Sequence, residues 1–264
     1  MRNKFAVGVF GILVSSGVWA AGEGHLTRIE RTSTLRVCVW PEYYGISFRS
    51  PKTGQLSGVD VDLAKEFKRE LKVQQLEFVD SSFARLIPDV LEDRCDIAMF
   101  AIGITPQRSA KLHFSSPHLQ SDIYAITTHS HARMRTWADI DQPGVVVAVA
   151  KGTLHEPIMR EKLKFATLRI SETPYAREQD VEAGRADVFM TDYPYGRRML
   201  DQVDWARLIS PPARYHVTPY AWAMAPGDAE WHRRVEGFMQ KIKHDGRLIA
   251  IARRYKLDSI ALVD

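Results

Sequence analysis

The chain has 264 residues, of which 26% are charged and 45% hydrophobic, and its formal net charge is +4 at pH 7. Charges of both signs are interspersed along the chain, so this small excess gives no reason to expect nucleic-acid binding. Beyond the N-terminal segment, no apolar stretch approaches the ~20 residues that a membrane-spanning helix needs. The chain contains no P-loop, Gly-x-Ser-x-Gly or Cys-x-x-Cys motif, and we expect neither a cofactor nor a metal ion.

Residues 1–20 have the pattern of a cleaved secretory signal peptide. Arg2 and Lys4 precede an apolar core over residues 5–14, and small residues lead to Val18 and Ala20. We expect cleavage after Ala20, export of the mature chain and a formal charge of +2. The remaining chain is long enough for two modest hydrophobic cores.

Strand and helix signals then alternate, which predicts a doubly wound α/β fold. The first series is a strand at 35–40, a helix with Leu63, Phe67 and Leu71 on one face, a strand at 76–79, a helix over 83–91 and a strand at 97–102.

The end of the last strand in this series predicts an anion site. Thr105 stands at a helix N-cap, Pro106 at the first helical position and Arg108 in the first turn. Free backbone N–H groups and a guanidinium would then face the same small anion, and a carboxylate is its natural partner. The alternative is an ordinary capped helix with a solvated arginine.

A second series follows, with a strand at 145–150, a helix at 155–163, a strand at 168–170, a helix ending at Gly184 and a strand at 187–190. Chain crossings near 122–127 and 218–224 would divide the chain into one discontinuous lobe, 34–121 plus 222–264, and a second lobe, 125–218. Asp192 lies at the carboxyl end of the strand at 187–190, where open α/β sheets bind their ligands. The alternative role for Asp192 is a helix cap.

The two cysteines, Cys38 and Cys95, would lie in an oxidising compartment, which favours a disulfide. With the predicted strands aligned as parallel neighbours, however, the two positions are offset by about three residues at ~3.3 Å each. That separation exceeds disulfide reach, so we expect no bridge.

Four segments, in order, resemble the family 3 periplasmic solute-binding proteins, the amino-acid receptors of ABC importers. These are residues 35–39, 58–64, 97–117 and 184–192, and the resemblance extends from about residue 35 to residue 257. It implies a type II periplasmic-binding-protein fold, in which two doubly wound lobes enclose a ligand cleft.

The resemblance also implies a set of ligand-binding residues. Arg108 would bind the carboxylate and Asp192 the α-ammonium group of the ligand. The other positions that match the family's site are Thr105, Gly103, Ala101, Thr153, Gly152, Phe83 and either Tyr43 or Tyr44. Several receptors for polar amino acids have hydroxyl side chains at the counterparts of Ala101 and Gly103, and Leu154 replaces a further hydroxyl, so the side-chain preference stays open.

The implied function is a monomeric periplasmic receptor that captures a polar L-amino acid or close analogue and delivers it to an ABC permease at the inner membrane. Exported cyclohexadienyl and arogenate dehydratases also resemble this chain over 185–192. In those enzymes a Glu three residues after the Asp is the general acid, whereas this chain has Tyr195. A phenol is a poor proton donor for that elimination, so we expect a protein that is not an enzyme.

Overall fold

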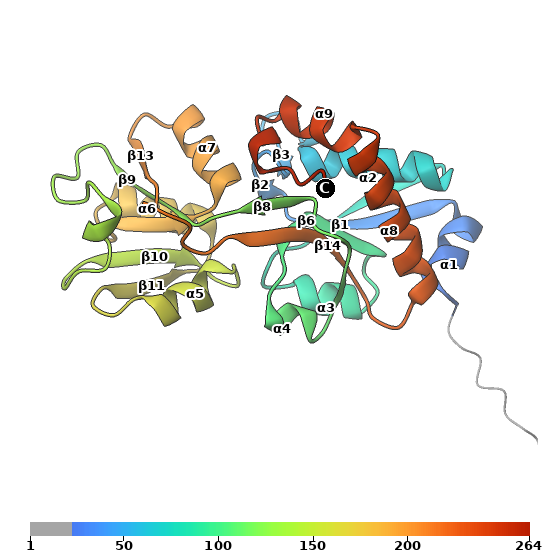
Figure 1. Cartoon of the computed structure of the whole chain (residues 1–264), viewed down its shortest axis with the longest axis horizontal. Coiled ribbons are helices and arrows are strands. Elements are labelled where there is room, and N and C mark those ends of the chain that lie inside the picture. The colour runs from blue at the N-terminus through green and yellow to red at the C-terminus, as the bar shows by residue number, and fades with distance from the viewer. Residues whose placement is uncertain (1–22) are drawn as a thin grey trace, which may run out of the picture.

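The computed structural model describes residues 23–264, so the predicted signal peptide lies outside the described residues. The chain forms two α/β lobes that lie side by side along the long axis of the molecule (Figure 1). Within residues 23–264, no helix is both long and apolar enough to cross a membrane. The expected two-lobed α/β architecture is therefore present.

The first lobe is built on a sheet with the strand order β5-β1-β6-β14-β7, and β8 also pairs with β14. β1 runs parallel to β5 and β6, whereas β14 is antiparallel to β6. The strands are β1 (Thr34–Val39), β5 (Gln75–Asp80), β6 (Ile97–Gly103), β7 (His113–Phe114), β8 (Leu119–Ser121) and β14 (Thr218–Met224). All seven residues of β6 are buried, as expected for an apolar strand covered on both faces.

Helices cover both faces of this sheet, and the C-terminal helices return to pack on it (Figure 1). They are α1 (His25–Thr32), α2 (Val59–Leu71), α3 (Leu86–Leu91), α4 (Pro106–Ser109), α8 (Ala229–His244) and α9 (Arg247–Arg254), with a final 3-10 turn at Asp258–Ile260. Between β1 and α2 the chain forms a small sheet of β2 (Glu42–Tyr43), β3 (Ser47–Arg49) and β4 (Leu56–Ser57).

The second lobe has a sheet with the order β11-β10-β12-β9-β13. Its strands are β9 (Tyr124–Thr128), β10 (Val146–Ala150), β11 (Thr167–Ser171), β12 (Val188–Thr191) and β13 (Ala206–Ile209). The helices α5 (His155–Lys162), α6 (Pro174–Glu182) and α7 (Tyr193–Gln202) pack on it, and Trp137–Asp139 forms a 3-10 turn.

The chain passes between the lobes after β8 and again before β14 (Figure 1). β9 pairs only within the second sheet, whereas β14 pairs with strands of the first sheet from Thr218 onward. This membership supports a discontinuous first lobe and a continuous second lobe; the bounds 34–121 plus 222–264 and 125–218 stay our proposal, although residues 218–221 pair within the first sheet.

The expectation that the cysteines are unpaired is wrong. Cys38 and Cys95 form a disulfide, with their Cα atoms 5.5 Å apart. Cys38 does lie opposite Ala98, which is the three-residue offset expected. Cys95, however, precedes β6 in an irregular segment that bends toward β1, where the Asp96 N–H donates to the Arg36 carbonyl at 2.9 Å. Extending β6 backward in a straight line therefore overestimated the distance between the two cysteines.

Candidate functional site

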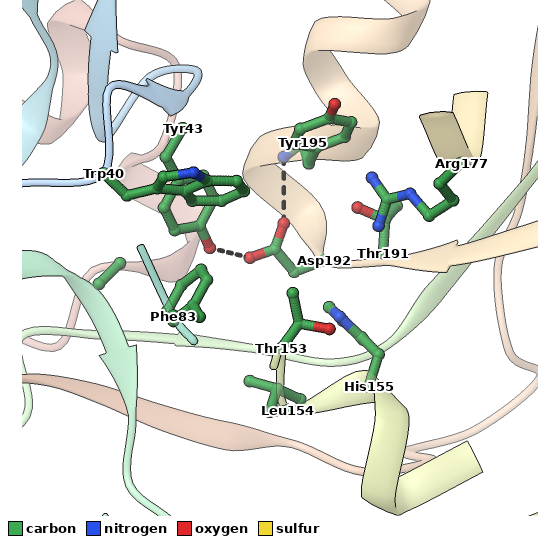
Figure 2. Close-up of a pocket in the computed structure, with 11 residues that line it drawn as sticks. Trp40, Tyr43, Phe83, Thr153, Leu154, His155, Arg177, Thr191, Asp192 and Tyr195 are labelled. Atoms are coloured by element: carbon green, nitrogen blue, oxygen red, sulfur yellow. Dashed lines mark hydrogen bonds between the residues drawn. The ribbon is translucent and has the colours of Figure 1, made fainter. Parts of the chain in front are cut away.

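A buried pocket lies between the lobes, at the carboxyl ends of strands from both sheets (Figure 2). The cavity has a volume of about 20 Å³. The lining residues are Trp40, Tyr43, Phe83 and Ala101 from the first lobe and Thr153, Leu154, His155, Arg177, Thr191, Asp192 and Tyr195 from the second. Parallel strands place their ligand sites at this edge, which makes the pocket the candidate functional site.

Asp192 caps a helix and also faces the pocket. Its Oδ1 accepts a hydrogen bond from the Tyr195 N–H at 3.1 Å, which begins α7. Its Oδ2 accepts from the phenols of Tyr43 and, at 3.0 Å, of Tyr220 (Figure 2 shows the bond to Tyr43). Burial raises the pKa of the Asp192 carboxyl, although these three donors oppose the shift. Within residues 23–264 no cationic group lies within ion-pair distance of it.

Arg108 occupies the predicted helix start but stands beside the pocket rather than lining it. As predicted, Thr105 is the N-cap of α4, and its hydroxyl accepts from the Arg108 N–H at 3.3 Å. The guanidinium donates to the Gly103 carbonyl at 3.0 Å and, across the lobes, to the Gly152 carbonyl at 3.3 Å. Burial lowers the pKa of Arg108 to about 10, so the group stays charged at neutral pH.

The loop over residues 151–155 approaches the first lobe closely. Gly152 has φ +74, and a Cβ built there would lie 2.9 Å from the backbone N and Cα of Ala84. Thr153 lines the pocket, but its hydroxyl donates to the Ala150 carbonyl at 2.7 Å. The loop therefore supplies close backbone approach, and the Thr153 hydroxyl is already engaged.

Of the two neighbouring tyrosines that could match the family's aromatic position, Tyr43 lines the pocket and Tyr44 does not. Tyr43 is buried in the pocket, with its ring centroid 5.8 Å from that of Phe83. Tyr44 instead packs against Phe48 at 5.3 Å, outside the pocket. Trp40 completes the aromatic wall at 5.0 Å from Phe83.

Ala101 and Gly103 of β6, which replace the hydroxyl residues of several receptors, each contact another part of the protein. The Ala101 N–H donates to the buried Asp60 carboxylate at 2.6 Å, so Ala101 offers the pocket its methyl group rather than a free N–H. The space beside Gly103 is filled by Leu154, whose Cδ2 would be 2.8 Å from an added Cβ. Gly103 and Leu154 therefore form one interlobe packing contact.

The sequence did not identify four of the lining residues, Trp40, His155, Arg177 and Thr191. It also did not predict that Tyr195 lines the pocket. The rule that pointed to Asp192 would also have found Trp40 and Thr191, because both lie at carboxyl ends of strands. Arg177 lies on α6 and has no such signal.

His155 is fully enclosed in the site. Neither of its ring nitrogens makes a hydrogen bond of normal geometry. Burial lowers the pKa of His155 to about 3, the charges of Arg177 and Arg108 act in the same direction, and the Thr191 backbone weakly opposes them. The ring is therefore neutral at physiological pH.

His131 Nε2 lies 2.8 Å from an Asp187 carboxylate oxygen, at the opposite end of the second sheet's strand β12 from the pocket lining. In the described part of the chain, no group of three or more His, Cys, Asp or Glu side chains is arranged to hold a metal ion.

Known proteins resemble the chain along most of its length. It is 35% identical over 181 residues to cyclohexadienyl dehydratase of Pseudomonas aeruginosa, covering 68% of this chain and 67% of that protein. It is 22% identical to the L-cystine-binding protein TcyJ of Escherichia coli, over 97% and 96% of the two chains.

Among solved structures, the ancestral amino-acid-binding protein AncCDT-1, described as a precursor of cyclohexadienyl dehydratase, matches with a TM-score of 0.79 and 30% identity, covering 87% of this chain and 98% of that one. The amino-acid-binding protein AbpA of Streptococcus pneumoniae, bound to L-arginine, matches with a TM-score of 0.79 at 23% identity, over 88% and 98% of the chains, and supports the fold alone.

These relatives overturn the expectation that the protein is not an enzyme. That expectation rested on Tyr195 in place of a general-acid glutamate. A relative that shares 35% identity is itself a dehydratase, and an ancestral precursor of that enzyme has the same fold. One substitution in the site is too little to exclude catalysis.

The structure and its neighbours establish the type II periplasmic-binding-protein fold, with two lobes about a cleft. The family model of the bacterial extracellular solute-binding proteins, family 3, matches residues 35–258. The chain therefore belongs to the family 3 bacterial extracellular solute-binding proteins.

Proposed function

We propose that the cleft captures a polar L-α-amino acid or a close analogue, with Arg108 binding its carboxylate and Asp192 its ammonium group. The observation that carries this proposal is the Asp192 carboxylate, which is buried at the pocket without a cationic partner in the described chain and is held by phenols and one backbone N–H. A buried carboxylate is stabilised far more by a cation than by neutral donors. An ammonium group of the ligand meets that requirement.

Lobe closure is the expected mode of capture. The structure is closed through two direct contacts at the site, from Tyr43 to Asp192 and from Arg108 to the Gly152 carbonyl. The ligand would replace these with its own ammonium and carboxylate groups. Trp40, Tyr43 and Phe83 would then cover its side chain with apolar area.

Delivery to a membrane permease is the second part of the proposal. Relatives named as amino-acid-binding components of ABC transporters support it, including the glutamine-binding protein GlnH of Bacillus subtilis. We propose a monomeric periplasmic receptor whose closed form presents both lobes to an ABC permease at the inner membrane.

Dehydration of a cyclohexadienyl ligand in the same cleft is a second candidate function, favoured by the 35% identity to such an enzyme. In such an elimination the ring carboxylate leaves as CO2, its C–C bonding electrons enter the ring, and the hydroxyl group takes up a proton and leaves as water. Burial raises the pKa of the Tyr195 phenol, which makes it a still weaker acid, and its O–H donates to the Glu178 carboxylate. Tyr195 lines the pocket at the position of the relatives' acid, so catalysis by this route depends on a weakly acidic phenol.

One purified sample tests both candidates. A thermal-shift screen of the common amino acids should find at least one that raises the melting temperature. If none of them raises it, the receptor proposal is wrong. Prephenate and arogenate are then incubated with the protein. Formation of the aromatic product above the uncatalysed rate would establish the dehydratase, and its loss in Tyr195→Phe would assign the proton donor.

A further inference from the structure

Arg177 places a second guanidinium in the pocket. It lies on α6, is 2% exposed, and its Nη1 donates to the Met190 carbonyl at 3.0 Å. Its guanidinium carbon lies 4.3 Å from the Phe189 ring centroid and 4.7 Å from that of Tyr195. These contacts fix the plane of the group, and Figure 2 shows it beside His155 and Thr191.

The edge of Arg177 that binds carboxylates has no partner. Nε is buried without a hydrogen bond, and within residues 23–264 the only hydrogen bond from the guanidinium is the one from Nη1. No carboxylate of the described chain lies within ion-pair distance of it. The Nε and Nη2 donors form the parallel pair that grips a carboxylate side-on. A buried, unpaired cation is costly, and that cost is offset when an anion binds.

The charges around the pocket do not balance. Arg108 and Arg177 are cations and Asp192 is the anion, whereas His155 is neutral and the phenols of Tyr43 and Tyr220 keep their protons. Glu178 contacts the Tyr195 hydroxyl but does not line the pocket. A zwitterionic amino acid would pair Arg108 and Asp192 and leave Arg177 uncompensated.

We propose that Arg177 is a specificity-determining residue that makes this cleft select ligands with a second carboxylate group, such as a dicarboxylic amino acid. The inference rests on the proposed function, because Arg108 and Asp192 are assigned there to the α-carboxylate and the ammonium group. The aromatic wall of Trp40 and Phe83 lies on the opposite side of the pocket and suits an apolar body between the two anionic ends (Figure 2).

The test compares amino acids of similar size whose side chains end in a carboxylate or in the corresponding amide. Calorimetric titrations measure Kd for L-glutamate against L-glutamine and for L-aspartate against L-asparagine, and arogenate is added as a ring-bearing dicarboxylic amino acid. The unmodified protein is expected to bind a dicarboxylic member at least ~10-fold more tightly than its amide, as for a buried charged pair. Equal or tighter binding of the amides, or no binding by any of the three dicarboxylic ligands, would overturn the inference.

Arg177→Met then assigns the preference to this side chain, with folding checked by circular dichroism. The ratio of the two Kd values is expected to fall toward one, while Arg177→Lys keeps part of the preference. The matched control is Arg160→Met, because Arg160 lies on α5 of the same lobe, its side chain is 61% exposed and it does not line the pocket. This control is expected to keep the ratio of Kd values between amide and acid. A folded Arg177→Met protein that also keeps this ratio would refute the assignment of the preference to Arg177. If Arg177→Met does not fold, the comparison in the unmodified protein and the Lys variant still decides.

Failure of the proposed function has a different signature. If Asp192→Asn leaves the affinity for glutamate unchanged, the assignment of the ammonium group is wrong. The ratio of Kd values for amide and acid is measured in the unmodified protein and does not depend on that result.

Discussion

At the scale of single residues, Asp192 serves the fold and the pocket with different oxygens. Oδ1 caps α7 through the Tyr195 N–H, and Oδ2 faces Tyr43 and Tyr220. The cap and the proposed ligand contact therefore coexist, which explains why sequence reasoning could not choose between them. Asparagine would retain the cap but not the charge, which makes Asp192→Asn an informative substitution.

His155 makes the stability of the protein depend on pH. The unfolded chain takes up a proton at this histidine near pH 6.5, whereas the buried ring stays neutral down to a pKa of about 3. The unfolded state thus binds more protons in this range, so stability is full above pH 6.5 and is lost as pH falls toward 3. In His155→Gln, urea denaturation should show a shallower loss of stability between pH 7 and pH 4.5.

The control for this experiment is His244→Gln, because His244 is exposed at the end of α8. It should keep the pH dependence of the unmodified protein. Parallel curves for His155→Gln and the unmodified protein would show that the buried ring does not set this slope.

The residues of the pocket differ in how far sequence could reveal them. Asp192 and the Thr105–Arg108 helix start were predictable because strand ends and N-caps have local signals. Arg177 and His155 were not, because their burial depends on how α5 and α6 pack against the second sheet. Helical arginines are usually solvated, so no local pattern separates this one.

At the scale of elements, the long periodic segments matched their predicted types. α2, β6 and β10 lie where hydrophobic spacing placed them. The short strands β2, β3 and β4 were missed because two or three residues contain no period. The disulfide was missed for a related reason. Strand periodicity does not predict the path of the irregular segment that contains Cys95.

Gly152 tests whether the loop after β10 must approach the first lobe. Alanine there would overlap the Ala84 backbone across the closed cleft. By analogy with overpacked cores, Gly152→Ala should weaken ligand binding by about 1–3 kcal/mol, as measured by calorimetry.

Gly184→Ala separates this effect from backbone strain. Gly184 has φ +71, close to the +74 of Gly152, but no atom lies within 4 Å of its added Cβ. Both variants should lose about 1–2 kcal/mol of stability from the left-handed conformation, and only Gly152→Ala should lose affinity. Equal affinities in the two variants would mean that closure does not bring Gly152 against Ala84.

At the scale of the whole molecule, side-chain contacts outside the pocket and inside it hold the lobes together. Arg198 of α7 lies 5.6 Å from the Tyr44 ring centroid and 5.1 Å from that of Phe48, both in the first lobe. Tyr43 reaches Asp192 inside the pocket. Two chain crossings and these side-chain contacts are the geometry expected of two lobes that close by hinge motion.

The disulfide should stabilise the first lobe without affecting the site. Cys38 and Cys95 are 57 residues apart in sequence, and neither lines the pocket. Replacing both with serine should lower the free energy of unfolding by about 2–4 kcal/mol, as measured by denaturant titration. Ligand affinity should stay unchanged under conditions where the variant is folded, and a large loss of affinity would show that the bond also positions the cleft.

In the proposed site, Arg108 on one lobe and Asp192 on the other bind the two charges of one amino-acid ligand. The most direct measurement is a calorimetric titration of the ligand found in the screen into the unmodified protein, Arg108→Ala and Asp192→Asn. Each substitution should cost about 2–5 kcal/mol of binding free energy, as when one partner of a buried charged pair is removed. Affinity that stays within about twofold of the unmodified protein in either folded variant would rule out this pair of ligand contacts, since 1.4 kcal/mol already corresponds to a tenfold change.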